Sequence, residues 1–294
     1  MSNLREIRGR INSVKNTMKI TNAMYLLASS KMKKARRSVD ATAPFFRAVQ
    51  ETMAEIAGGA GDLANTCGYF RRTEGEDKRH LFLIITSDRG LAGSYNHNII
   101  RLAEEKIALP GADSLMFIGY NGRNYFMRQQ KDRTELTMED DYTAPATEPV
   151  MWRAMDYARH IARRFQDRET DEVWLIYTRM VNAMASRTEC IRLLPLEPAD
   201  FRKEGGGRGG MVYLPSPEAV FTKSVPNYLT GVLYGAMVES YAAEQNARMQ
   251  AMDSATGNAR EMLQDLSLLY NRVRQAAITQ EITEVIGGSQ ARER

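Results

Sequence analysis

The stretch that decides the fold is residues 246–288, "NARMQAMDSATGNAREMLQDLSLLYNRVRQAAITQEITEVIGG". It contains no proline and no turn dipeptide before Gly287-Gly288, so it predicts one uninterrupted helix that reaches back to about Pro226. Apolar or small residues recur in it at alternating steps of three and four, which is the spacing of a coiled-coil seam. The predicted seam consists of Met252, Ala255, Ala259, Met262, Leu266, Leu269, Val273 and Ala276.

The other end of the chain carries a second seam with the same spacing. No proline interrupts it before Pro44, and apolar spacing continues beyond that residue as far as Gly58-Gly59. Because a single chain has to fold back on itself, the two seams are predicted to pair with each other in antiparallel fashion. The N-terminal seam consists of Leu4, Ile7, Ile11, Val14, Met18, Thr21, Tyr25, Ala28, Met32, Ala35 and Val39.

The middle of the chain alternates apolar strand-like runs with helical segments. Strands are predicted at 80–88, 114–120, 171–180 and 186–198, and helices at 95–108, 121–130 and 149–166. Such alternation is typical of a parallel-rich α/β sheet covered on both faces. The expected fold is therefore an antiparallel coiled coil of long terminal helices with an inserted Rossmann-like α/β domain. The predicted boundaries are 1–57 for the first helix, 58–215 for the α/β domain and 216–294 for the last helix.

Composition sets limits on the class of protein. The chain has 294 residues, 43% hydrophobic and 26% charged, as globular proteins do. No apolar run approaches the roughly 20 residues of a membrane span, and the N-terminus has no signal-peptide core. Cys67 and Cys190 have no metal-ligand spacing and indicate a reducing compartment.

The positive charge is concentrated at the N-terminus. Residues 1–40 hold ten Lys and Arg against Glu6 and Asp40, which gives this segment a net charge of +8. A basic helix of this kind serves as a solvated surface, or it binds nucleic acid, a membrane surface or an acidic protein. The first alternative function is therefore a coiled-coil nucleic-acid-binding protein. It would need stacking aromatics, of which the segment and its continuation offer Tyr25, Phe45 and Phe46.

No motif of catalysis stands out. There is no P-loop, the three histidines at 80, 97 and 160 have no metal spacing, and the glycines of 205–210 follow no predicted strand. The loop "TSDRGLAGS" (86–94) follows a strand and precedes a helix, where phosphate often binds. Its glycines are explained as turn residues, with Asp88 or Ser94 as caps. We expect no catalytic residue, cofactor or metal, and an α/β enzyme acting at this loop is the second alternative.

Three blocks of the sequence resemble the γ subunit of F-type ATP synthases. They are "IRGRINSVKNTMKITNAMYLLASSKM", "TSDRGLAGSYNHNI" and "EQNARMQAMDSATGNAREMLQDLSLLYNRVRQAAITQEITEVIGG". The resemblance implies a non-catalytic rotor shaft that transmits torque during ATP synthesis or hydrolysis coupled to protons or sodium. It also implies a peripheral location, within the synthase, on the cytoplasmic face of a bacterial inner membrane. Ala92 stands where many members have cysteine, and the chloroplast regulatory insertion is absent.

The resemblance further implies partners and contact residues. The partners are the α and β subunits of the catalytic ring, the ε subunit and the membrane c-ring, with no nucleic acid and no membrane span. The contacts fall into three groups: catch loops of β, the ring's bearing, and the c-ring foot. The residues implied are Arg274, Gln275 and Thr279 for the catch loops; Met24, Lys31, Ile282, Val285 and Ile286 for the shaft and bearing; and Tyr213 for the foot.

Overall fold

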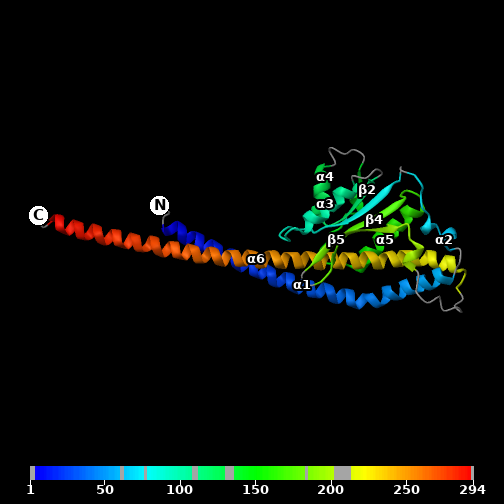
Figure 1. The fold of residues 1–294 in the computed structure, drawn as a ribbon, viewed down its shortest axis with the longest axis horizontal. Helices are drawn as coiled ribbons and strands as arrows, with labels where there is room; N and C mark the ends of the chain where they lie inside the picture. The colour runs from blue at the N-terminus through cyan, green and yellow to red at the C-terminus, as the bar shows by residue number, and fades with distance from the viewer. Residues whose placement is uncertain are drawn as a thin grey trace. The chain divides into compact units, whose positions relative to one another are not determined.

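The computed structural model describes residues 4–59, 63–75, 78–107, 112–129, 136–182, 185–201 and 213–292. The chain divides into two compact units. The smaller unit comprises residues 1–28 and 248–294, and the larger unit comprises residues 29–247. Two long helices, α1 (Leu4–Gly59) and α6 (Pro217–Arg292), contribute to both units (Figure 1). The glycine-rich segment 205–210 lies outside the described residues.

Both long helices contain an internal proline, and the predicted start of the second helix at Pro226 is wrong. The helix begins at Pro217, and Pro226 lies inside it. Ser216 supplies the cap, because its hydroxyl oxygen accepts a hydrogen bond from the amide of Ala219 at 3.1 Å. A proline directly after the cap fits the first helical position, where its missing amide hydrogen costs nothing. Helix α1 likewise runs through Pro44.

The larger unit contains a five-stranded sheet in the order β3-β2-β1-β4-β5. All four predicted strands are present, as β1 (His80–Ile85), β2 (Ala112–Ile118), β4 (Glu172–Met180) and β5 (Ser186–Leu194). Strands β3, β2, β1 and β4 pair in parallel with their neighbours, and β5 pairs antiparallel with β4. The short strand β3 (Thr137–Met138) was not predicted, because two residues carry no periodicity.

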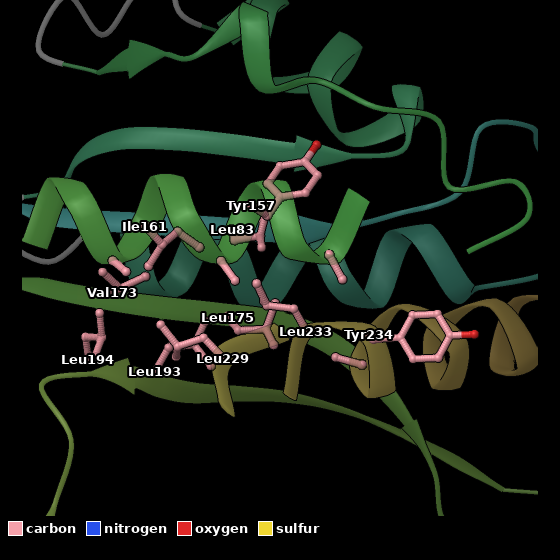
Figure 2. Close-up of a cluster of buried hydrophobic side chains, with 14 of the residues drawn as sticks. Leu83, Tyr157, Ile161, Val173, Leu175, Leu193, Leu194, Leu229, Leu233 and Tyr234 are labelled. Carbon is pink, nitrogen blue, oxygen red and sulfur yellow. The ribbon is translucent and has the colours of Figure 1, made fainter. Parts of the chain in front are cut away.

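Helices cover both faces of the sheet, as the strand–helix alternation predicts. Helices α3 (Tyr95–Ile107) and α4 (Tyr120–Gln129) lie on one face, and α5 (Met151–Gln166) and α6 on the other (Figure 1). Alternate residues of β1 point to opposite faces, so Leu83 joins the α5 and α6 core while Ile84 joins the α3 and α4 core. Figure 2 shows Leu83 and Leu175 from the sheet, Ile161 from α5 and Leu233 from α6 in one cluster.

Within the larger unit, α1 and α6 approach closely at a glycine. A Cβ atom on Gly231 would lie 2.3 Å from Cδ1 of Phe46, so only glycine leaves room for the ring. Phe46 also lies near Tyr234, with ring centroids 6.3 Å apart. This contact fixes the position of the two helices against each other at that point.

Two adjacent carboxylates close the amino end of the sheet. Asp171 accepts hydrogen bonds from Thr73 at 2.8 Å and from both the backbone amide and Nε of Arg79 at 3.1 Å. Glu172 accepts from Lys78 at 2.9 Å and from the Trp174 indole at 3.1 Å. Burial alone would raise the pKa of each carboxyl, but these donors outweigh it and hold both pKa values below the ordinary range.

This pair predicts acid sensitivity of the larger unit. A carboxyl whose pKa is depressed by folding stabilises the native state above its unfolded pKa, and that stability is lost as the pH falls through the folded pKa. We expect the free energy of unfolding to decline below the ordinary pKa values of 3.8 and 4.5. Urea unfolding from about pH 6 to about pH 3 measures it. Asp171→Asn should give a flatter profile, and an unchanged profile would contradict the assignment.

Candidate functional site

The smaller unit is an antiparallel pair formed by the start of α1 and the end of α6 (Figure 1). On α1 the structure confirms the predicted seam, because each of its positions from Leu4 to Ala28 is buried or half-buried. Ile7 is 2% exposed and Ala28 is 1% exposed. Most residues that lie between the seam positions, such as Ile20 at 61%, are exposed. The alternating spacing of three and four residues therefore predicts correctly which face of α1 is buried.

On α6 the structure confirms part of the predicted seam. Met252, Ala255, Ala259, Leu266 and Val273 are buried or half-buried as expected, but Met262 is 52% and Leu269 is 39% exposed. Ala276 is also exposed. The alternate seam positions lie one residue further along the helix than predicted. They are Thr256, Leu263, Tyr270 and Ala277, all of them buried or half-buried.

A pair of threonines joins the two helices across this seam. Oγ1 of Thr21 and Oγ1 of Thr256 lie 2.8 Å apart in a buried hydrogen bond. In an antiparallel pair, each residue towards the start of α1 corresponds to one residue further along α6. Counted from Thr21 and Thr256, Leu4 therefore lies level with Val273. The seam of α6 therefore ends close to the first described residue of α1.

Beyond Ala277, α6 continues as far as Arg292 and presents an apolar stripe. Ile278, Ile282, Val285 and Ile286 recur at i, i+4, i+7 and i+8, which is one face of a helix. Their side chains are between 48% and 72% exposed. Four large aliphatic side chains exposed on one helical face mark an interaction surface.

The residues expected to meet the catch loops lie just before this stripe. Arg274 and Gln275 are both exposed, and they directly follow the half-buried seam residue Val273. Thr279 is exposed as well, but its hydroxyl donates to the carbonyl of Gln275 at 2.9 Å. Its oxygen therefore remains available mainly as an acceptor. The other implied shaft residues divide between the units: Met24 is half-buried in the smaller unit, and Lys31 is exposed in the larger one.

Tyr213, the residue expected at the foot, is half-buried and packs against the core of the larger unit. Its neighbour Leu214 is 80% exposed. Of these two residues, Leu214 offers the larger contact surface to a partner.

The loop 86–94, the second candidate site, lies at the carboxyl edge of the parallel strands, where α/β folds bind ligands. Its carboxylate is already engaged. Asp88 accepts hydrogen bonds from the amides of Tyr120 at 3.3 Å, Ala146 at 3.0 Å and Thr147 at 2.9 Å, and from the Thr147 hydroxyl at 2.5 Å. It therefore acts as a clamp that holds three loops together.

The first three amides of α4, a helix that begins at the same edge of the sheet, are all engaged. The amide of Tyr120 donates to Asp88, that of Asn121 to the carbonyl of Ser87 at 3.1 Å, and that of Gly122 to Oγ1 of Thr86 at 2.9 Å. A phosphate site at a helix start needs such amides free. Across the described ranges, no group of three or more His, Cys, Asp and Glu side chains is arranged to hold a metal.

Taken together, these features define a class: an antiparallel coiled-coil protein with an inserted three-layer α/β domain. The family model described as ATP synthase matches residues 3–291. The ATP synthase gamma chain of Acetivibrio thermocellus is 41% identical over 99% of this chain and 99% of its own length. This chain belongs to the ATP synthase γ-chain family. That membership decides against the nucleic-acid-binding alternative.

Solved structures of the same fold come from mitochondrial ATP synthases. A chain from the Tetrahymena thermophila central stalk and c-ring is 25% identical, with a TM-score of 0.61 over 80% of this chain and 99% of its own. A chain from the Euglena gracilis enzyme is 18% identical, with a TM-score of 0.67 over 98% of this chain and 94% of its own. Among the described helices, none is long and apolar enough to cross a bilayer.

Proposed function

We propose that this chain is the central rotor shaft of its ATP synthase and transmits torque between a membrane ring and a catalytic ring. The observation that carries the proposal is the seam of the smaller unit followed by the exposed apolar stripe of α6. A two-stranded seam packed by knobs-into-holes contacts gives a stiff rod. An apolar tip suits rotation, because dispersion contacts lack the directionality that would hold it at one angle.

The chain itself performs no catalysis under this proposal. The loop 86–94 stands where an α/β enzyme would bind a ligand, yet its carboxylate already accepts hydrogen bonds from the amides of Tyr120, Ala146 and Thr147. An anion entering this place would have to displace Asp88, which carries the same charge. The ATP-hydrolysing sites of the complex therefore belong to other subunits.

The contacts with those subunits are assigned to three places. Arg274, Gln275 and Thr279 meet the catch loops of β, with Met24 and Lys31 on the neighbouring shaft surface. Ile282, Val285 and Ile286 run in the apolar bearing formed by the α and β ring. The assignment is supported by the exposure of these residues, which leaves them open to a partner. Met24 is the exception, because it is half-buried.

The larger unit supplies the foot that meets the c-ring and the ε subunit, with Tyr213 and Leu214 at the contact. Within this unit, the foot itself is the α/β domain at residues 58–215, between the two long helices. The similarity to the ATP synthase gamma chain of Acetivibrio thermocellus supports a place on the cytoplasmic face of a bacterial inner membrane, attached through the complex.

Rotation of the chain inside its own complex tests the function. Asp141 is exposed on the larger unit, so an Asp141→Cys variant in a Cys190→Ala background accepts a bead there. Cys67 is buried and will not compete for the label. With α and β subunits fixed to a surface, ATP should drive continuous rotation of the bead. Sustained hydrolysis by a labelled complex whose bead stays still would refute the rotor function.

The catch-loop assignment predicts a loss of turnover when Arg274 and Gln275 are both replaced with alanine. Each charge-assisted hydrogen bond to a partner is worth about 1.5–3 kcal/mol. We expect ATP hydrolysis of the assembled complex to fall several-fold or more, measured at matched subunit content. The seam residues Val273 and Ala277 are untouched, so the variant should still assemble.

A matched control is Arg159→Ala, which removes the same charge from an exposed position on α5. This variant should hydrolyse ATP like the parent. If the double variant also keeps parental turnover, Arg274 and Gln275 are wrongly assigned, while the bead assay still decides the rotor function.

A further inference from the structure

The buried surface between the two helices of the smaller unit is almost wholly apolar. Among its described side chains, Thr21 at 8% and Thr256 at 5% exposed are the two buried polar residues. Each stands at a seam position, where an aliphatic side chain of the same shape would pack equally well. A hydroxyl pair placed there adds directionality that the rest of the seam does not have.

The geometry of the pair supports a lasting bond between the helices. Oγ1 of Thr256 lies 2.8 Å from the carbonyl of Met252, and Oγ1 of Thr21 lies 3.1 Å from the carbonyl of Met18. The two hydroxyls, 2.8 Å apart, have two protons for these three contacts. When one hydroxyl donates to its own helix, the other can donate across the seam, so the cross-helix bond persists whichever hydroxyl donates.

Twisting a two-helix rod makes its helices slide along each other. Apolar contacts oppose such sliding through many non-directional atom pairs, each worth about 0.1–0.2 kcal/mol. A hydrogen bond at 2.8 Å is lost when the two oxygens separate by about 1 Å more. The threonine pair therefore adds to the packed seam one directional contact that a slide of this size breaks.

We propose that Thr21 and Thr256 are positioning residues that lock α1 against α6 and set the torsional stiffness of the shaft. The inference rests on the proposed rotor function. With the lock intact, a twist applied at one end of the helix pair reaches the other end without loss through sliding. Without it, the helices remain paired, and part of the twist is taken up within the pair.

The test is the double variant Thr21→Val with Thr256→Val. Valine keeps the shape of threonine, and replacing both partners with apolar groups leaves no unpaired buried hydroxyl. We therefore expect the unfolding temperature of the full chain to be unchanged or higher. In the assembled complex, the torsional stiffness read from bead fluctuations with the tip anchored should fall to half or less.

A second double variant, Thr21→Ser with Thr256→Ser, retains the hydroxyl pair and should retain the parental stiffness. Parental stiffness in the valine variant would overturn the lock. Equal softening in both variants would also overturn it, because the methyl groups rather than the hydroxyls would then matter. A parent complex that fails to rotate would instead refute the rotor function, so the two failures are distinguishable.

Discussion

Replacing Gly119 with alanine is expected to cost the larger unit most of its stability. Gly119 follows β2 with a φ of +97°, a conformation that side-chain-bearing residues rarely adopt. A Cβ atom there would lie 2.2 Å from the carbonyl oxygen of Thr86. That backbone is held in place, because the amide of Thr86 donates to Ile118 and the amide of Gly119 donates to Ala144, both at 2.7 Å.

The clash and the strain act together at this position. We expect a loss of about 4 kcal/mol or more in the free energy of unfolding, the range reached when overpacking and backbone strain combine. Urea unfolding followed by tryptophan fluorescence measures it, because Trp152 and Trp174, the two tryptophans of the chain, both belong to the larger unit.

Gly75 offers the matched control. It also has a positive φ, +120°, but a Cβ atom there meets nothing within 4 Å. Gly75→Ala should therefore cost only the conformational strain, about 1–3 kcal/mol. Equal losses in the two variants would show that the close approach to Thr86 contributes nothing.

A glutamate at Ile7 is the second change with a large expected effect. Ile7 is 2% exposed and lies level with Tyr270 across the seam of the smaller unit. An unpaired carboxylate buried there costs several kcal/mol, which the helix pair avoids by separating. We expect hydrogen exchange to become fast in residues 4–28 and 248–277, while the amides of the β-sheet keep their protection.

The same substitution at Ile20 tests whether burial or charge is responsible. Ile20 lies on the same helix and is 61% exposed, so Ile20→Glu should leave exchange in the full chain unchanged. If Ile7→Glu also left it unchanged, the seam would not be what holds the two helices together.

The seam of α1 could be predicted from sequence because its neighbours are unambiguous. Between Leu4 and Met18 the seam positions are apolar, and most of the residues between them are charged or polar. On α6 the choice was ambiguous, since Met262 precedes Leu263 and Leu269 precedes Tyr270, and either member of each pair fits the spacing. Which member of each pair is buried depends on how α6 packs against α1.

Thr256 shows the physical reason for that error. A threonine is a weak seam candidate by hydrophobicity, and it gains its place from a partner 235 residues away. The predicted residue Ala255 is half-buried beside it, but further along the helix the seam follows the register of Thr256, so Met262, Leu269 and Ala276 are exposed. Only the geometry of the pair reveals that the hydroxyl is satisfied inside the seam.

The clamp of Asp88 was likewise beyond sequence reasoning, although the loop itself was recognised. Its partners at 120, 146 and 147 come from two other loops, up to 59 residues away. The sequence predicts that loop 86–94 is a turn that carries Asp88 and lies where phosphate often binds. The structure shows that this carboxylate is engaged by the amides of Tyr120, Ala146 and Thr147.

The apolar stripe of α6 also bears on how the chain is made and handled in the cell. Ile278, Ile282, Val285 and Ile286 are exposed until a partner covers them. A newly synthesised copy therefore carries an adhesive end, which favours self-association and capture by chaperones. Under the proposed bearing assignment, synthesis of this chain in excess of its partners should yield aggregated or degraded protein rather than a stable free pool.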